Sequence, residues 1–337
     1  MTFSLWFDTG GGGLPGRANR LQSGVRYRDE DSFTAALRRR LPSRGRVRLG
    51  IGDDAAVLAG GTVLTVDGYR QGVHFDLHYL SWREVGARCA CAALSDVVAM
   101  GARPDALFVT LALPPAARRR DVTALYRGLD SVCARLGCEI AGGDTIAGRE
   151  LLLALAATGR TQCPLLRAGA RPGDGLYLTG QAGAAETGRL RLARDPAASR
   201  RNPAVSRHVR PRPRLEAMLA LRPRITALID TSDGIAGDAR RLARASEVRI
   251  IIAPEHLPTL TATRTLCRRS GRDLTEFILT AGEDHELLFC ARGPVPGRAG
   301  AVPVTRIGRV ERGRGLWLER AGRRQRLTLR GYDHLRP

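Results

Sequence analysis

Four short apolar runs, each bounded by glycine, proline or polar residues, predict β-strands in the first half of the chain. Their length and their turn-forming ends are typical of strands buried in a sheet. In chain order the runs are DAAVLAG (54–60), TVLTVDG (62–68), DALFVTLALP (105–114) and LLLALAATG (151–159). They predict the strands of an N-terminal sheet domain.

Three further stretches carry apolar residues at helical spacing. Residues 81–100 and 119–137 predict long helices, and residues 32–41 predict a short helix with Ser32 as its N-cap. Strands and helices do not alternate strictly, and the glycine signature of a dinucleotide-binding fold is missing. The pattern therefore predicts an α+β fold rather than a doubly wound sheet.

The second half predicts another α+β unit. Residues 171–183 have the pattern of a turn, a strand and a glycine-rich turn, and residues 225–246 that of a strand, a turn and a helix. The stretch 199–215 is rich in proline and arginine, which favours a surface connection over a core element.

We therefore expect two α+β domains, at residues 31–162 and 163–337, behind a flexible extension at residues 1–30. A length of 337 residues and an apolar share of 43% are enough for two cores. No apolar run reaches the roughly 20 residues of a membrane span, and the first residues lack the pattern of a secretory signal. These features predict a cytoplasmic protein that does not enter a membrane.

Every one of the 54 basic residues is arginine, and the net charge is +21. One interpretation is a compositional bias on solvated surfaces, and the other is an anionic partner, either nucleic acid or a phosphorylated small molecule. Aromatic residues make up only 5% and do not interleave with the basic clusters, which argues against nucleic-acid binding as the main function. The absence of lysine excludes P-loop enzymes, protein kinases and Schiff-base catalysts.

The seven cysteines are an odd number and include no CxxC pair. This argues against a disulfide framework and against a zinc site. We expect buried thiols, with Cys89 and Cys91 in the core face of an apolar helix.

Acidic residues beside glycine or hydroxyl residues recur at the ends of apolar runs. Any one of them could be a helix cap or a turn. Several together in a basic chain instead favour a site for a hard cation such as Mg²⁺, which shares carboxylates with phosphate groups. The adjacent glycines would let backbone N–H groups approach phosphate oxygens. The segments are GIGDDAAVL (50–58), TVDG (65–68), LSDVVAMGA (94–102), AGGDTIAG (141–148), DTSDG (230–234) and AGEDHELLF (281–289).

Ten motifs occur in the order and wording of one enzyme family. They are GIGDDAAVL, GVHF, LSDVVAMGARP, LALP, GGDT, LLRAGARPGD, RHVRPRPRL, DTSDG, GEDHELLF and GYDHL. On these motifs the chain, from about residue 31 to residue 335, resembles thiamine-monophosphate kinase in the superfamily of aminoimidazole-ribonucleotide synthase. The resemblance implies phosphorylation of thiamine monophosphate by ATP and Mg²⁺, in a homodimer formed through the N-terminal domains. The missing lysine and the ending DHLRP distinguish the chain from selenophosphate synthases and hydrogenase-maturation relatives.

The resemblance also implies roles for individual residues. The implied magnesium ligands are Asp54, Thr65, Asp67, Asp96, Asp230 and Asp233, and the last two would also be the catalytic residues. The residues implied in ATP binding are Gly143, Asp144, Arg167 and Ser232. The residues implied near thiamine phosphate are His74, Glu283 and Tyr332. Because the ligands come from both predicted domains, we expect the site in an interdomain cleft.

This division of roles agrees with the chemistry of phosphoryl transfer. A phosphate monoester with a second pKa near ~6 is already ionised at neutral pH and needs no general base. The obstacle is the repulsion between two polyanions, which several Mg²⁺ ions would relieve while aligning direct in-line transfer. Arg167 could make, in a bidentate way, the phosphate contact that lysine makes elsewhere. The helix expected to begin near Ile235 would point its positive end at phosphate.

Several of these side chains have structural alternatives. His74 could be a structural histidine, and Tyr332 could pack a last turn. Tyr126 shares a helix face with Val122 and Leu129, which favours the core or an interface over an adenine contact.

Neighbouring acids also have simpler interpretations. Asp53 is expected to cap or orient Asp54, and Asp284 and Glu286 to be surface acids at a strand end.

The chain departs from the family pattern at Val66 and in the following GYRQ. This leaves open a paralogous kinase that acts on another phosphate monoester. A third hypothesis is an arginine-rich nucleic-acid-binding protein without catalysis. The retained carboxylates argue against it, since packing like charges together is unfavourable without a cation.

Overall fold

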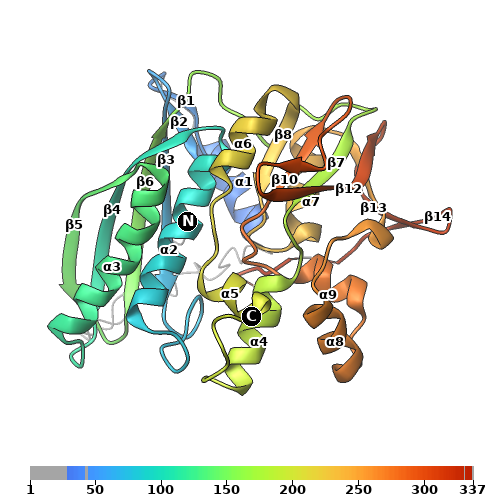
Figure 1. Ribbon diagram of the computed structural model, residues 1–337. Helices are drawn as coiled ribbons and strands as arrows, with labels where there is room; N and C mark the ends of the chain where they lie inside the picture. Colours follow the sequence, from blue (N-terminus) through green and yellow to red (C-terminus); the bar gives the residue numbers. More distant parts are fainter. Residues whose placement is uncertain (1–28, 42–44, 330, 336–337) are drawn as a thin grey trace, which may run out of the picture.

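The computed structural model describes residues 29–41, 45–329 and 331–335 and contains two β-sheets, each covered by helices (Figure 1). The predicted α+β fold is confirmed. Most of the expected extension, residues 1–28, lies outside the described ranges. Within those ranges, the helices are too short or too polar to cross a membrane.

The first sheet lies beside two long helices that cover one of its faces (Figure 1). Its elements are β1 (Val47–Leu49), β2 (Ala56–Leu58), β3 (Thr62–Arg70), β4 (Arg103–Leu113), β5 (Glu139–Ala147) and β6 (Leu152–Arg160), with helices α2 (Trp82–Ala99) and α3 (Arg119–Leu136). The strand order is β1-β2-β3-β6-β4-β5, with β5 parallel to β4 at the edge. The four strands and two long helices expected here are confirmed, whereas the glycine-rich segment at 141–148, expected as a turn, forms most of β5.

Helices α2 and α3 approach closely at a pair of glycines. A Cβ atom on Gly86 would lie 2.1 Å from the carbonyl oxygen of Leu125, and one on Gly128 would lie 2.0 Å from a backbone oxygen of α2. Any larger residue would force the helices apart, because real Cβ contacts are not this short. The close contact leaves α2 buried between α3, the sheet and the second half of the chain.

Six of the seven cysteines are buried thiols, including Cys89 and Cys91 in the core of α2, as predicted. Cys163 is exposed, so the prediction is wrong for this residue. It lies on the connection between β6 and β7.

The first helix, α1 (Glu30–Arg40), begins earlier than expected. Its N-cap is Asp29, whose carboxylate accepts a hydrogen bond from the backbone N–H of Ser32 at 2.8 Å. Ser32 is therefore the third helical residue of a capping box and not the cap itself. Glu30 belongs to this helix and not to a flexible extension.

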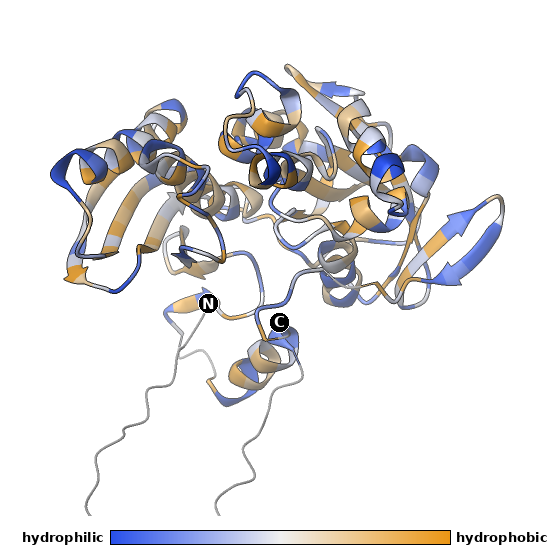
Figure 2. Cartoon of the chain, turned by 90° about the horizontal axis from the view of Figure 1, so that it is seen from below, coloured by the Kyte–Doolittle hydropathy of each residue, from blue (hydrophilic) through white to orange (hydrophobic). Residues whose placement is uncertain are grey.

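The second sheet has the order β14-β13-β9-β12-β7-β10-β8, and a short β11 pairs with β12. Its strands are β7 (Gly175–Thr179), β8 (Ile225–Asp230), β9 (Arg249–Ile252), β10 (Leu287–Ala291), β11 (Arg298–Ala299), β12 (Val302–Glu311), β13 (Gly315–Arg320) and β14 (Arg323–Arg326). The hairpin of β13 and β14 projects from the sheet and is hydrophilic along β14 (Figure 2).

Helices pack on both faces of this sheet, with α7 and α9 contributing to one core and α6 to another. The helices are α4 (Ala184–Arg194), α5 (Pro203–Val209), α6 (Leu215–Leu221), α7 (Ile235–Ala245), α8 (Thr261–Ser270) and α9 (Leu274–Thr280), with 3₁₀ turns η1 (Arg222–Arg224) and η2 (Pro254–His256). The strand, turn and helix predicted over 225–246 are confirmed as β8 and α7.

The prediction of a surface connection over 199–215 is wrong for its central part. Asn202 caps α5, and Val205 and Val209 are fully buried in the core of the first half. The many prolines and arginines of this stretch made it look polar, although Val205 and Val209 are spaced to share one helix face. Pro203 stands at the first helical position, where proline is tolerated. Because α5 packs on α2, the second half of the chain completes the first core; a domain boundary near residue 163 stays a prediction.

Burial of a histidine in α5 predicts a pH-dependent stability. His208 is 1% exposed, and both ring nitrogens lack a hydrogen-bond partner among the described atoms. Burial, followed by the charges of Arg88 and Arg189, holds the pKa of His208 well below its usual value of 6.5. The unfolded chain therefore takes up the proton first, and the stability that the neutral ring contributes is lost as the pH falls below 6.5.

We expect the wild-type protein to lose up to about 1.4 kcal/mol per pH unit from this group, relative to a His208→Leu variant. Urea unfolding of both proteins at pH 7.5 and 5.5 isolates the effect, because all other groups are shared. Equal pH dependence in the two proteins would show that His208 titrates as in the unfolded chain.

Candidate active site

Three aspartates from both halves of the chain meet in one cluster. Asp54 lies just before β2, Asp96 near the end of α2 and Asp230 at the end of β8. One carboxylate oxygen of each lies within 4.8 Å of the other two. Asp54 and Asp230 are buried and Asp96 is half-buried. The structure thus brings together three of the six residues implied as metal ligands.

The cluster concentrates negative charge where little water can solvate it. Burial raises the pKa of Asp54 to about 7; the charge of Asp230 adds to the rise, and Arg167 opposes it. Burial, followed by the charges of Asp67 and Asp230, raises the pKa of Asp96 well above its usual range. Carboxylates held in this way are unfavourable until a cation neutralises them.

The donor atoms of the cluster fit a hard cation. Oδ2 of Asp54 is buried and has no hydrogen-bond partner among the described atoms. The hydroxyl of Thr65 donates to Oδ2 of Asp96 at 3.0 Å, which places a further oxygen at the cluster. Oxygen ligands of this kind suit Mg²⁺, which binds few carboxylates and keeps other positions for water and phosphate.

Two other implied ligands lie outside the group of three. Asp67 accepts a hydrogen bond from the hydroxyl of Tyr69 at 3.0 Å. Asp233 pairs with Arg241 at 2.7 Å, and the same guanidinium contacts Asp238 at 2.9 Å. Each of these two carboxylates thus has a protein partner of its own.

Arg167 lies directly against the cluster. Its Nε and Nη2 donate to Oδ1 of Asp54 at 3.0 and 2.5 Å. Asp53 accepts from the backbone N–H groups of both Asp54 and Arg167, at 3.0 and 3.2 Å. As expected, Asp53 orients its neighbour, and it also ties this segment to the chain entering the second sheet.

Two loops, at residues 231–234 and 281–286, contact each other next to Asp230. Gly234 precedes α7 with a φ of 105°, and a Cβ there would lie 2.8 Å from the backbone of Thr280, so only glycine fits. Ser232, in the same turn, accepts from the backbone N–H of Glu283 at 2.8 Å. The turn after β8 is therefore held directly against the loop at residues 281–286.

Two acids of that second loop are anchors, Glu286 buried and Asp284 half-buried, so the expected surface position is wrong for Glu286 and only partly right for Asp284. Asp284 accepts from the backbone N–H groups of Gly183 and Ala185 at 2.6 and 2.8 Å, at the start of α4. Glu286 is 1% exposed and forms a two-pronged ion pair with Arg214. Glycine and acid spacing alone could not reveal these partners, because they come from distant segments.

The three residues implied near the substrate lie around one region. The ring of His74 lies 5.0 Å from that of His334, which lies 4.8 Å from that of Tyr332. The backbone N–H of Tyr332 donates to Asp233 at 3.0 Å, so the C-terminal segment is tied to the turn after β8. Glu283 forms an ion pair with the buried Arg88, whose Nε also reaches the carbonyl of His74 at 3.5 Å.

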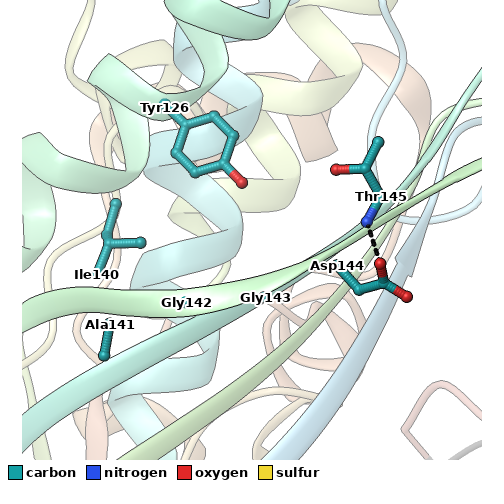
Figure 3. Close-up of a pocket in the computed structure, with 7 residues that line it drawn as sticks. All are labelled: Tyr126, Ile140, Ala141, Gly142, Gly143, Asp144 and Thr145. Atoms are coloured by element: carbon teal, nitrogen blue, oxygen red, sulfur yellow. Dashed lines mark hydrogen bonds between the residues drawn. The ribbon is translucent and has the colours of Figure 1, made fainter.

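The residues implied in ATP binding on β5 line an open hollow of about 600 Å³ (Figure 3). Gly143 approaches β4 so closely that a Cβ would lie 1.8 Å from the carbonyl oxygen of Val109. The side chain of Asp144 is exposed and accepts from the backbone N–H of Thr145 at 2.8 Å. Tyr126 is half-buried: it packs against the first core, as expected, and also lines this hollow.

Sequence reasoning missed four residues at this site: Arg88, Arg241, His285 and His334. Arg88 was the easiest of the four to predict from the sequence, because a charged residue among the apolar positions of a helix signals a buried partner of opposite charge. His285 contacts Asp230 at 3.3 Å, but only the folded loop brings the two together.

Comparison with known proteins agrees with this fold and site. Residues 52–161 match the family described as AIR synthase related protein, N-terminal domain. The structure of E. coli HypE, at 21% identity and a TM-score of 0.65, shares the fold. These matches, with the buried carboxylates, define the class as an AIR synthase-related enzyme.

Relatives with higher identity define the family within this class. The chain is 34% identical to thiamine-monophosphate kinase of Rhodopirellula baltica over 325 residues, which cover 90% of this chain and 97% of the relative. The structure of AaThiL complexed with AMPPCP and TMP matches with a TM-score of 0.81 and 29% identity, over 91% of this chain and 97% of that one. The chain belongs to the thiamine-monophosphate kinase family, whose members use ATP to phosphorylate thiamine monophosphate to thiamine diphosphate.

Proposed function

We propose that the enzyme transfers the γ-phosphoryl group of ATP directly to thiamine monophosphate at the carboxylate cluster. The observation that carries this proposal is the convergence of three carboxylates from both halves of the chain within 4.8 Å. Bound Mg²⁺ would neutralise the two phosphates and align them for transfer. The residues that would hold it are Asp54, Asp96 and Asp230, with Thr65, Asp67 and Asp233 completing the set.

The chain's own residues position the reactants. A phosphate oxygen of thiamine monophosphate attacks the γ-phosphorus of ATP, the bond to the β-phosphate oxygen breaks, and ADP leaves. No protein base is required, because the attacking oxygen is already ionised at neutral pH. The turn at Ser232 and the N-terminus of α7 present backbone N–H groups to phosphate oxygens, and Arg167 supplies a positive charge beside Asp54.

ATP is proposed to lie along β5. Gly143 and Gly142 leave the strand without side chains at the hollow, so a ligand can approach the backbone. Tyr126 offers a half-buried ring for stacking on the base. Within the described part of the chain, the side chain of Asp144 accepts a hydrogen bond from its neighbour Thr145 and is exposed, which supports a role toward a bound ion or phosphate rather than toward the fold.

Thiamine monophosphate is proposed to bind near His74, Glu283 and Tyr332, where rings and a carboxylate surround one region. The test is the rate of product formation from ATP, Mg²⁺ and thiamine monophosphate, compared with a panel of other phosphate monoesters. We expect kcat/KM for thiamine monophosphate to exceed that for the others by at least about 10²-fold. A higher kcat/KM with another monoester would identify a paralogous kinase with the same machinery.

We also propose a homodimer formed through the face of the first sheet that no helix of the described residues covers. Val66 and Phe108 are each 39% exposed and both pair with Ala156 of the strand between them, so they form an apolar row on the face opposite α2. Ile146 on β5 is 53% exposed. A second copy presents the same row, which makes a two-fold pairing self-complementary.

Phe108→Arg is expected to convert the dimer to a monomer, because a charge on this row cannot be buried unpaired. Light scattering after size exclusion measures the mass of the wild type, of this variant and of a Leu41→Arg control at an exposed apolar position outside the sheet. A monomeric wild type, or a dimeric Phe108→Arg variant, contradicts this interface.

A further inference from the structure

Arg88 is a guanidinium buried inside an apolar helix. It is 3% exposed, and its neighbours on α2 include the fully buried Val85 and Cys89. A charge in such a place is costly unless hydrogen bonds and an opposite charge satisfy it. The packing of α2 alone gives no reason for an arginine at this position, since an apolar residue would fill it without that cost.

The three arms of Arg88 reach three separate segments. Nε points to the carbonyl oxygen of His74 at 3.5 Å, Nη1 donates to the carbonyl oxygen of His208 at 2.5 Å, and Nη2 forms an ion pair with Glu283. The first segment follows β3 in the first half, and the other two belong to the second half. The planar, rigid fork of arginine suits this task, whereas lysine could not hold all three directions.

Glu283 is the partner that connects Arg88 to the ligand region. Its backbone has a φ of 64°, in the left-handed region that residues other than glycine rarely adopt. Its backbone N–H donates a hydrogen bond to the carbonyl oxygen of Ser232. Its side chain remains 36% exposed although Oε2 pairs with Arg88. The second carboxylate oxygen can therefore accept a hydrogen bond from a ligand while Arg88 holds the first.

We propose that Arg88 is a positioning residue for substrate specificity: it fixes Glu283 and the His74 loop so that one carboxylate oxygen faces an amine-bearing or cationic heteroaromatic ring. This inference rests on the proposed binding of thiamine monophosphate near those residues. It extends the substrate site to a buried side chain that does not touch the substrate and acts through residues from both halves of the chain.

The test compares Arg88→Met, Arg88→Lys and a matched control, Arg222→Met. Arg222 also joins distant segments, through the Gly101 and Cys163 carbonyls and the hydroxyl of Thr161, but it contacts no residue of the ligand region. In Arg88→Met we expect KM for thiamine monophosphate to rise about tenfold or more, the value of one charged hydrogen bond. Turnover at saturation and KM for ATP should change little.

Arg88→Lys should raise KM for thiamine monophosphate less than Arg88→Met does. Lysine keeps the positive charge but lacks the planar guanidinium that contacts three segments. Arg222→Met should lower the melting temperature without changing KM for thiamine monophosphate. If both Arg→Met variants lower stability and activity alike, or if KM for ATP and for thiamine monophosphate rise equally in Arg88→Met, the positioning role is overturned.

A double variant with Glu283→Gln separates a positioning role from general damage. In that background Arg88→Met should raise KM for thiamine monophosphate by less than about twofold, since its effect passes through Glu283. If the increases in KM caused by Glu283→Gln and by Arg88→Met instead multiply in the double variant, the two residues act independently and the proposal is contradicted. Wild-type protein without activity on thiamine monophosphate overturns the proposed function together with this inference, whereas an active wild type with an unchanged KM in Arg88→Met overturns this inference alone.

Discussion

Asp96→Asn is expected to lower kcat by at least about 10²–10³-fold and, at the same time, to raise the melting temperature of the metal-free protein. Activity falls because one carboxylate of the cluster no longer neutralises the bound cation's charge. Stability rises because Asp96 is held beside Asp54 and Asp230, and burial and repulsion make its ionised form unfavourable. Asparagine keeps the shape of the side chain and can still accept the hydrogen bond from Thr65.

The two opposite changes distinguish a metal site from an ordinary structural acid. Melting temperatures with and without Mg²⁺ should show a large stabilisation of the wild type by the ion and a small one in Asp96→Asn. Asp105→Asn, which removes a carboxylate whose partner is the exposed Arg160, serves as the control and should keep both activity and the Mg²⁺ effect. An active Asp96→Asn variant, or one that melts lower without metal, would contradict the assignment.

Arg214→Met is expected to destabilise the fold by about 3–5 kcal/mol, because it leaves the carboxylate of Glu286 buried without its main partner. In the wild type, Arg214 and the hydroxyl of Thr179 contact Oε2 of Glu286 at 2.6 and 2.7 Å, and Arg207 lies 3.6 Å from Oε1. Arg207 is itself one-third exposed and cannot replace the lost two-pronged contact. The free energy of unfolding in urea measures the loss.

A solvated ion pair provides the matched control for this change. In the pair of Arg314 and Glu247 the side chains are 80% and 74% exposed, and Arg314→Met should cost less than about 1 kcal/mol. A similar loss in both variants would show that burial does not decide the strength of the Glu286 pair. Because Glu286 ends the loop at residues 281–286 that carries Glu283, just before β10, Arg214→Met should also raise KM for thiamine monophosphate.

The strands and the acidic turns could be predicted from the sequence because both depend on local patterns. The run at 62–68 becomes β3, and the strand at 225–230 ends at Asp230 before a turn with Gly234, as expected. The sequence pattern alone did not predict that Asp230 lies beside Asp54 and Asp96. That expectation came from the family resemblance, which implied a site between two domains. The structure adds that carboxylate oxygens of Asp54, Asp96 and Asp230 lie within 4.8 Å of one another. It also shows which of these side chains are buried.

The parts that could not be predicted depend on contacts between distant segments. Glu286 has the local pattern of a surface acid, and only Arg214, 72 residues away, makes it a buried anchor. The stretch 199–215 looked like a polar connection because its six arginines outnumber its four apolar residues, although α5 within it buries Val205 and Val209. Arg88 shows the same limit, since its three partners lie 14, 120 and 195 positions away in the chain.

The account rests most directly on transfer from ATP to thiamine monophosphate with Mg²⁺ at the carboxylate cluster. The decisive measurement follows ADP and thiamine diphosphate in one reaction, with Mg²⁺ and with excess EDTA. The account predicts equal amounts of the two products with Mg²⁺ and neither product with EDTA. ADP without thiamine diphosphate, or thiamine diphosphate formed in EDTA, would contradict it.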